Sequence, residues 1–394
     1  MTKTPSLLGD LSTETFLQEY WQKRPLLIRN ALPSYQSPIS PDELAGLACE
    51  EGVESRLIIE KDGPSPWYLR YGPFTDTDFQ QLPETNWTLL VQECNKYVPE
   101  LAQLLDHFNF IPRWRVDDVM VSFAPQHGSV GPHVDQYDVF LIQAYGTRRW
   151  QISNKIVDKD NFIPNIDLQI MQEFSPTEEW VVEPGDILYL PPGLPHFGLA
   201  LEDCMTLSVG FRAASYSDIL TNFVDKKIQH MTQNETAPRY SDPELNLQKH
   251  SGEISQESLN KVQDILKEAI EDKDHMQRWF AQLVTQTSGT DEIPTDEIQM
   301  SSQELFNRLR NGDVLIRSEY SRFAFINRQE HGCYLFIDGE ESRFEKALLP
   351  AIAELCDQSR YDTGALLNHL QDDVFSELVV QLINSNKLYF ENDE

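Results

Sequence analysis

The chain has 394 residues, more than one hydrophobic core usually organises, so two or three domains are expected. Hydrophobic residues make up 40% of the sequence and aromatic residues 10%, which excludes a disordered composition. Acidic side chains outnumber basic ones by 63 to 32, so the formal net charge is −31. This charge repels nucleic-acid phosphates and anionic membranes and favours cationic partners, although a need for solubility alone could also account for it.

Cysteine usage and hydropathy narrow the cellular context. The five cysteines are scattered without a Cys-x-x-Cys pair, which argues against a zinc ribbon or a disulfide framework. No run approaches the ~20 apolar residues that span a bilayer, and the first residues lack the apolar core of a signal peptide. We therefore expect a cytoplasmic protein that neither spans nor binds a membrane.

The first part of the chain shows mostly helical signals. Capping residues and apolar periodicity predict an N-terminal helix, one short apolar strand and two further helices, over 14–21, 25–29, 41–50 and 87–97. The character then changes to short strands separated by Gly and Pro turns. We predict strands over 116–124, 139–145, 149–153, 180–182, 186–190, 198–201 and 206–211. Many short strands at regular spacing are typical of an antiparallel sandwich or barrel.

Helical patterns return after residue 217, and polar stretches at 232–251 and 288–294 divide the remainder of the chain. The last segment alternates helices with short strands and has an Asp338-Gly339 turn signal, an arrangement that resembles a small winged-helix domain. Such domains often bind DNA, but the acidic composition favours a structural or dimer-supporting role. We predict a catalytic part, a helical linker or dimerisation segment and a winged-helix-like part, over 1–214, 215–292 and 293–394.

Two short runs far apart in the sequence indicate the chemistry. The first is GPHVD at 131–135, and the second is EPGDILYLPPGLPH at 183–196. If the first run is a strand, its alternation places His133 and Asp135 on one face. With His196 from a distant strand they would form a facial set of two imidazoles and one carboxylate. That set leaves positions open on an octahedral iron(II) ion.

The second run is the more specific of the two. Gly185 permits a tight turn into the strand over 186–190, and the Pro-Pro-Gly turn after that strand would swing His196 into the barrel. Either histidine alone would be read as an ordinary core or surface residue in a chain with nine histidines. Zinc could take the same ligands, but zinc enzymes usually leave a single open position. The two runs together therefore predict an iron site.

The same runs carry a family resemblance. Residues 185–196 resemble the second motif of cupins, except that Ala200 stands where cupins usually have Asn. His133-Val-Asp135 replaces the His-x-His of most cupins, as in the JmjC oxygenases, which use iron and 2-oxoglutarate. The resemblance extends to bacterial ribosomal oxygenases through further runs and covers essentially the whole chain. These runs are residues 20–28, 130–140, 146–150 and 208–212.

The resemblance implies a fold and a set of cofactors. The fold would be α+β: a double-stranded β-helix of the jelly-roll, cupin and JmjC kind, then a helical segment and a winged-helix-like domain. The activity would be that of a dioxygenase that uses Fe(II) with 2-oxoglutarate and O₂ as co-substrates. The family position that binds the remote carboxylate of 2-oxoglutarate falls on Arg148, and arginine offers that carboxylate a permanent, bidentate charge. Arg149 would point to the opposite face.

The closest matching members of that family hydroxylate an arginine of a large-subunit ribosomal protein. A basic protein substrate would suit the acidic chain, and a homodimer is expected from the resemblance. Four residues could bind the substrate side chain: Asp118 by pairing with a guanidinium, Met120 by packing on its methylenes, Tyr137 by stacking or hydrogen bonding, and Ser208 as an acceptor. Each assignment is weak when taken alone, because a Tyr or Ser in a strand more often serves packing.

Three alternatives stay open at this point. A related hydroxylase could act on a histidyl side chain of a ribosomal protein instead. A cupin-fold binding protein without activity could retain the same architecture. The winged-helix-like segment could belong to a DNA-binding regulator, but a net charge of −31 makes direct nucleic-acid readout a poor expectation.

Overall fold

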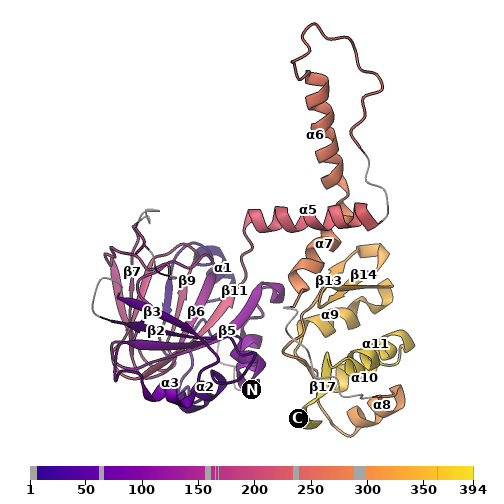
Figure 1. Ribbon diagram of the computed structural model, residues 1–394. Helices are drawn as coiled ribbons and strands as arrows, with labels where there is room; N and C mark the ends of the chain where they lie inside the picture. The colour runs from indigo at the N-terminus through magenta and orange to yellow at the C-terminus, as the bar shows by residue number, and fades with distance from the viewer. Residues whose placement is uncertain are drawn as a thin grey trace. The chain divides into compact units, whose positions relative to one another are not determined.

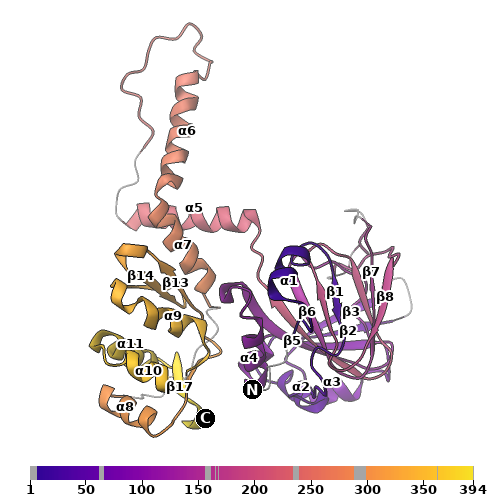
Figure 2. The same ribbon diagram turned by 180° about the vertical axis from the view of Figure 1, so that it is seen from behind.

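The computed structural model describes residues 7–61, 66–155, 161–164, 166, 168–233, 239–287, 299–361 and 363–393. The chain divides into two compact units (Figures 1 and 2). The first consists of Met1–Ala213, Ser288–Ser321 and Ala353–Glu394, and the second of Ala214–Thr287 and Arg322–Ile352. The division of the chain into a catalytic part, a helical segment and a winged-helix-like part at residues 214 and 292 stays a prediction.

The first unit is built around two antiparallel sheets. The larger has eight strands in the order β1-β9-β6-β11-β5-β4-β2-β3, and the smaller has three in the order β10-β7-β8. The strands of the large sheet are β1 (Leu26–Ile28), β2 (Ser55–Glu60), β3 (Trp67–Tyr71), β4 (Trp87–Val91), β5 (Val116–Ala124), β6 (Asp138–Tyr145), β9 (Ile187–Leu190) and β11 (Cys204–Phe211). Those of the small sheet are β7 (Arg148–Ile152), β8 (Glu178–Val182) and β10 (His196–Ala200). This is the predicted double-stranded β-helix.

The two faces of the large sheet have different partners. On the outer face, side chains such as Val121, Phe140 and Leu207 form a buried core with the helices that follow. These helices are α1 (Thr13–Glu19), α2 (Pro41–Leu47), α3 (Asp76–Gln80) and α4 (Pro99–Leu105). On the inner face, Leu141 and Leu188 pack against the small sheet. Because strand side chains alternate, the other inward positions also project between the sheets.

One predicted element is wrong. The helix expected over 87–97 is the strand β4, which is followed by a 3-10 helix at Cys94–Lys96. β4 pairs with β2 on one side and β5 on the other, and every residue after Trp87 in it is buried. A short apolar run buried on both faces lacks the period-two alternation of a half-exposed strand, so its sequence cannot be told from a helix by periodicity. The strands β2 and β3 were not predicted either.

Polar contacts fix the N-terminal segment to the barrel. Asp138 is completely buried at the start of β6 and accepts hydrogen bonds from Tyr189 Oη at 2.6 Å and Gln22 Nε2 at 2.8 Å. Farther along the segment, Arg29 Nη1 donates to Asp186 Oδ2 at 2.6 Å. These bonds fix the edge strand β1 against β9. They also anchor the start of β6, which follows the run at 131–135.

The first unit also contains helices and strands from the end of the chain. A three-stranded sheet in the order β16-β12-β17 accompanies three helices. The elements are α8 (Ser302–Arg310), β12 (Leu315–Arg317), β16 (Arg360–Tyr361), α10 (Thr363–His369), α11 (Asp373–Asn384) and β17 (Leu388–Phe390). α9 (Leu349–Asp357) spans the boundary between the units. The remaining 3-10 helices are Asp106–Phe108, Arg113–Arg115, Gln329–His331, Lys346–Leu348 and Glu391–Asp393.

The second unit combines three helices with an antiparallel sheet in the order β13-β14-β15. Its elements are α5 (Tyr216–Gln233), α6 (Gln256–Glu271), α7 (Lys273–Thr285), β13 (Phe323–Asn327), β14 (Cys333–Ile337) and β15 (Glu340–Phe344). The predicted Asp338-Gly339 turn joins β14 to β15 with a positive φ at both residues. α7 packs on this sheet through Ala281, Tyr334 and Phe336. α5 meets α7 where Phe223 contacts Trp279, with ring centroids 5.0 Å apart.

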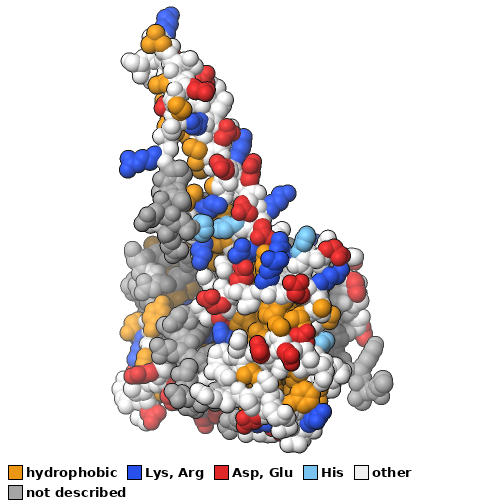
Figure 3. All heavy atoms as spheres, turned by 90° about the vertical axis from the view of Figure 1, so that its right-hand side faces the viewer, with side chains coloured by type: hydrophobic (Ala, Val, Ile, Leu, Met, Phe, Trp, Pro, Cys, Tyr) orange, Lys and Arg blue, Asp and Glu red, His pale blue; other side chains and the backbone are white. Residues whose placement is uncertain are grey.

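The helix α6 has an apolar stripe that its own unit does not cover. No residue of α6 is buried, although Leu259, Val262, Leu266 and Ile270 lie along one side of it. Figure 3 shows hydrophobic side chains among the charged ones along this helix, in the upper column of the view. None of the helices in the described part of the chain combines the length and hydropathy that a bilayer span requires.

Candidate metal centre

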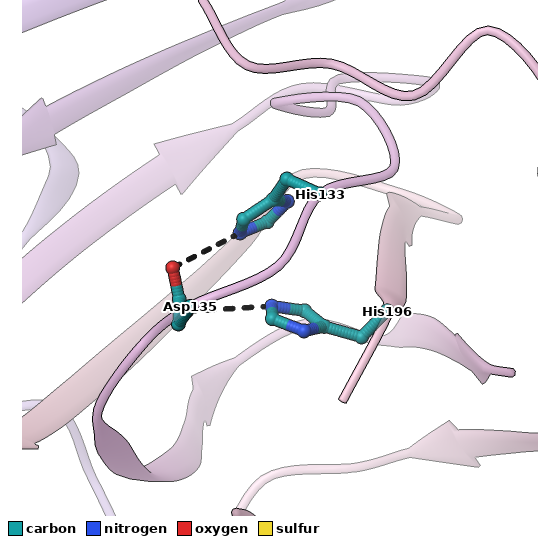
Figure 4. Close-up of side chains that lie close together, drawn as sticks. All are labelled: His133, Asp135 and His196. Carbon is teal, nitrogen blue, oxygen red and sulfur yellow. Dashed lines mark ion pairs between the residues drawn. The ribbon is translucent and has the colours of Figure 1, made fainter. Parts of the chain in front are cut away.

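The structure brings the three predicted metal ligands together. One potential ligand atom from each of His133, Asp135 and His196 lies within 4.8 Å of the others. Asp135 Oδ1 is 3.8 Å from His133 Nε2, and Asp135 Oδ2 is 3.5 Å from His196 Nε2 (Figure 4). Among the described residues, this is the one group of three or more His, Cys, Asp and Glu side chains close enough to hold a metal ion.

Backbone hydrogen bonds join the two runs that supply these ligands. His133 and His196 exchange a reciprocal pair, each N–H donating to the other's carbonyl at 3.0 Å. The Gly193 N–H of the Pro-Pro-Gly turn donates to the Asp135 carbonyl at 2.8 Å. Gly193 has φ +78°, which favours glycine. The turn therefore fixes the position of His196 and is also bonded directly to the other ligand run.

Each ligand histidine is oriented by a carbonyl two residues before it. His133 Nδ1 lies 2.9 Å from the Gly131 oxygen, and His196 Nδ1 lies 2.9 Å from the Leu194 oxygen. A carbonyl only accepts hydrogen bonds, so both Nδ1 atoms carry the proton and both Nε2 atoms present a lone pair. Fixing the tautomer through the other ring nitrogen is how proteins prepare histidines for metal ions.

Burial keeps His196 neutral. Its desolvation, followed by the neighbouring His133 ring, lowers the pKa of His196 to about 4. The two rings are close, with centroids 4.2 Å apart. A neutral imidazole is the form that binds a metal ion, so His196 is ready to bind at neutral pH.

The strand predicted over 131–135, which was expected to place His133 and Asp135 on one face, does not form. The run at 131–135 is not a strand; His133 forms one isolated bridge with His196, and β6 starts only at Asp138. Gly131 has φ +79°, and a Cβ there would lie 2.8 Å from the Ile170 side chain, so the segment is a tight, irregular turn. The ligands converge because this turn bends, not because strand residues alternate.

Arg148 lies on the inner face of the small sheet. Arg148, Trp150 and Ile152 are buried and alternate with the less buried Arg149 and Gln151, as predicted for the two arginines. Nε and Nη2 of Arg148 are buried and have no hydrogen-bond partner in the described part of the chain. A buried guanidinium with free N–H groups is costly unless an anion binds it. The structure thus provides a binding group for a carboxylate.

Trp150 separates Arg148 from the metal centre and was not recognised from the sequence. Its ring centroid is 5.9 Å from that of His196 and 5.6 Å from the Arg148 Cζ. Gly198 pairs with Trp150 across the sheet, and a Cβ at Gly198 would lie 2.7 Å from the Trp150 ring. The glycine therefore provides the space for the ring. Only a three-dimensional register, not a motif, reveals this pair.

The four residues expected to bind a substrate fall into two groups. Met120 and Ser208 pair across β5 and β11 and face the barrel interior, with Ser208 7% exposed. Asp118 faces the same way, and its Oδ2 accepts a hydrogen bond from Glu93 N at 2.8 Å. Tyr137 is 43% exposed and lies in the bend before β6, not on a strand.

Tyr137 lies in a charged environment. Burial of its hydroxyl, followed by the nearby Asp135 and Asp118 carboxylates, raises the pKa of Tyr137 above its ordinary value, so the hydroxyl stays a donor. The positive charge of Arg56 in β2 acts against this shift and lowers the pKa of the same hydroxyl. Arg56 was not predicted to belong to this region, because β2 was not recognised as a strand of the barrel. Its Nε is buried without a hydrogen-bond partner in the described chain.

The donor set fits a divalent first-row metal ion. Two imidazole nitrogens and one carboxylate oxygen on one side match the facial arrangement of non-haem iron(II) oxygenases. A jelly-roll barrel with such a set at its mouth and a buried arginine behind it defines a cupin-type oxygenase of the JmjC class. Residues 103–219 match the JmjC domain family, and residues 268–389 match the ROXA-like winged helix family.

Comparison with known proteins narrows this class. The chain is 36% identical over 382 residues to the ribosomal protein uL16 3-hydroxylase of Escherichia coli K12, covering 97% of this chain and 98% of that protein. It is 36% identical over 287 residues to a probable ribosomal oxygenase of Haemophilus influenzae, covering 70% and 68%. A solved structure of YcfD, a ribosomal oxygenase from E. coli, in complex with cobalt and 2-oxoglutarate superposes with a TM-score of 0.83 at 35% identity, covering 97% of this chain and 99% of that chain. The chain belongs to the JmjC-domain ribosomal oxygenases.

Proposed function

We propose that this protein is an iron(II)- and 2-oxoglutarate-dependent oxygenase that hydroxylates an arginine side chain of a large-subunit ribosomal protein. His133, Asp135 and His196 would bind the iron, and Arg148 would bind the remote carboxylate of 2-oxoglutarate. The observation that carries the proposal is the pairing of this triad with the buried, unpartnered guanidinium of Arg148 inside one barrel.

The spacing of these groups suits a five-carbon diacid. His196 and Ala200 lie four residues apart on β10, roughly 13 Å along the strand, and Arg148 pairs with Ala200. An extended arginine covers part of that distance, and 2-oxoglutarate would cover the rest. Trp150 lies between the two ends and would form one wall of the slot.

When bound, iron with 2-oxoglutarate and O₂ supplies the oxidising power that inserts oxygen into an unactivated C–H bond. The residues of the chain position the reactants and exclude water. His133, Asp135 and His196 would hold the metal ion from one side and would leave its other side accessible to the co-substrates. Leu141 and Leu188 belong to a buried apolar cluster between the two sheets, which would limit the access of water from that side. No general base is required from the protein.

The proposed substrate side chain would be recognised by charge and shape. Asp118 would pair with the guanidinium, Met120 would pack against its methylenes, and Tyr137 and Ser208 would add hydrogen-bonding groups. The net charge of −31 favours a basic partner. The E. coli relative is named for its action on ribosomal protein uL16, which supports a large-subunit substrate for this chain.

We also propose that the protein is a cytoplasmic homodimer without direct nucleic-acid readout. An α6 helix with no buried residue leaves Leu259, Val262 and Leu266 in water, which a second copy of the helical segment would cover. In this proposal the catalytic part is 1–214, the helical dimerisation segment is 215–292, and the winged-helix-like part is 293–394.

The function is tested by incubating the protein with ribosomal proteins, iron(II), ascorbate and 2-oxoglutarate. Peptide mapping should locate a mass gain of one oxygen atom on an arginine of a large-subunit protein. A modified histidine with unmodified arginines would contradict the proposed substrate residue. If no 2-oxoglutarate is consumed with any ribosomal protein and no iron is retained on purification, the chain is a binding protein.

A further inference from the structure

A threonine in the barrel interior has a hydroxyl group without a partner. Thr88 lies in β4 and is completely buried. Its Oγ1 makes no hydrogen bond within the described part of the chain. Buried hydroxyls are nearly always hydrogen-bonded. The unpartnered Thr88 hydroxyl, in a strand that is paired on both sides, therefore indicates a place where a ligand binds.

The alternation of β4 shows where this hydroxyl group lies. Leu89 and Val91 belong to the core on the outer face of the large sheet. Thr88 therefore faces the space between the two sheets, the same side as Ser122 of β5. The nearby inner hydroxyls are occupied: Ser122 Oγ donates to the Thr206 carbonyl at 3.4 Å, and Thr206 Oγ1 donates to Gln143 Oε1 at 3.2 Å.

Strand register places Thr88 at the same end of the barrel as Arg148. Leu89 pairs with Phe123, so the antiparallel register sets Thr88 opposite Ala124. Ala124 packs with Ala200 and Cys204 in one buried cluster. Ala200 in turn pairs with Arg148 on the small sheet. Each step joins inward-facing residues.

Gly128, in the loop after β5, contacts both β4 and β10 and so gives independent evidence that these two strands lie close together. The Gly128 carbonyl accepts a hydrogen bond from Ala200 N at 3.0 Å. A Cβ at Gly128 would lie 2.2 Å from the Trp87 carbonyl, so the backbone of Gly128 lies directly against the start of β4. The start of β4 and the end of β10 are thus neighbours, and the residues between Thr88 and Arg148 are small. By contrast, the interior next to Trp150 is filled by large side chains such as Leu141 and Ile152.

We propose that Thr88 is a second binding residue for the remote carboxylate of 2-oxoglutarate. Its hydroxyl donates one hydrogen bond to the carboxylate that Arg148 binds. A carboxylate has about four acceptor sites, enough for two N–H groups of Arg148 and one hydroxyl. The binding of this anion would satisfy, in one event, the three buried donors Thr88 Oγ1, Arg148 Nε and Arg148 Nη2. This inference rests on the proposed role of Arg148 and extends it.

The test measures binding in the absence of turnover. Mn²⁺ replaces iron, and wild type, Thr88→Val and Thr88→Ser are titrated with 2-oxoglutarate and with oxalate, which chelates a metal ion but has no remote carboxylate. Valine keeps the shape and removes only the hydroxyl. We expect Thr88→Val to bind 2-oxoglutarate about 10- to 100-fold more weakly, as for loss of a hydrogen bond to a charged group. Thr88→Ser should stay close to wild type, and oxalate binding should not change.

Thermal unfolding of the metal-loaded protein provides an independent readout. Without 2-oxoglutarate, Thr88→Val should melt at or above the wild-type temperature, because it removes an unsatisfied buried hydroxyl. With 2-oxoglutarate, its stabilisation by the ligand should be smaller than that of wild type. If Thr88 had a purely structural role, the ligand-free Tm of the variant would fall and the ligand-induced shift would be unchanged.

The two proposals fail in different ways. If wild type binds 2-oxoglutarate and Thr88→Val binds it equally well, Thr88 has no role and the proposed function stands. A variant that loses 2-oxoglutarate and oxalate to the same extent also overturns the role of Thr88, because the defect then lies at the metal ion. If wild type itself binds no 2-oxoglutarate in the presence of Mn²⁺, the proposed co-substrate is wrong.

Discussion

The indole ring of Trp150 lies across Gly198, and a Cβ on Gly198 would fall 2.7 Å from two carbons of that ring, Cη2 and Cζ3. The contact is formed by facing residues of β7 and β10, the strands that carry Arg148 and His196. Trp150 therefore connects the proposed carboxylate-binding group to the metal centre through direct side-chain contacts.

Gly198→Ala should disturb the co-substrate site. The added methyl group forces the Trp150 ring to move, and overpacking of this kind costs about 1–3 kcal/mol of unfolding free energy. We expect a higher KM for 2-oxoglutarate and a lower melting temperature. Gly46→Ala is the matched control, because a Cβ at Gly46 in α2 meets no atom within 4 Å. Equal kinetics for the two variants would show that the position of Trp150 does not matter.

Removing the guanidinium of Arg148 should weaken 2-oxoglutarate binding much more than metal binding. For Arg148→Met we expect the KM for 2-oxoglutarate to rise about 100-fold or more, because a buried, charge-assisted bidentate contact is lost. Arg149→Met is the control: Arg149 points to the other face and lies 3.5 Å from Glu179 there. Its KM should remain within about twofold of wild type, as for a surface ion pair. A similar rise in both variants would contradict the assignment.

The metal-free protein should lose stability as the pH falls from 6.5 toward 4. Burial, followed by the neighbouring His133, lowers the pKa of His196 in the folded chain from 6.5 to about 4. Between these values the unfolded chain binds a proton that the folded chain does not, so the free energy of unfolding decreases as the pH is lowered. Urea unfolding across this range should show a steeper decrease for wild type than for His196→Gln. Parallel curves would mean that His196 titrates normally.

A charge on the apolar stripe of α6 should dissociate the dimer. Leu266 is 64% exposed within its own chain and lies two helical turns from Leu259 on the same side. For Leu266→Glu we expect the mass measured by sedimentation to fall from that of a dimer to that of a monomer. Glu268→Lys changes the opposite side of the helix and should leave the mass unchanged. A wild-type protein that sediments as a monomer would remove the basis for the proposed interface.

The sequence predicted the strand-rich middle of the chain and the three ligand residues because both have local signals. Turn residues mark the strands of the barrel, and a Pro-Pro-Gly turn next to His196 is specific. The helix expected over 87–97 was wrong because a strand buried on both faces loses its alternation, and Thr88 was therefore missed. Trp150, Gly198 and Arg56 were missed for a related reason. Their roles arise from contacts between strands that are distant in sequence, and no short motif encodes such contacts.

The most direct test of the central claim is the mass of the large-subunit ribosomal proteins, uL16 among them, after reaction with this enzyme, iron(II) and 2-oxoglutarate. The wild-type enzyme should add one oxygen atom to a single arginine, with one succinate formed for each oxygen added. His133→Ala should leave the substrate mass unchanged, because the facial triad then lacks a ligand. If the wild-type enzyme modifies no arginine of any large-subunit ribosomal protein, or if His133→Ala modifies the substrate equally, the account is contradicted.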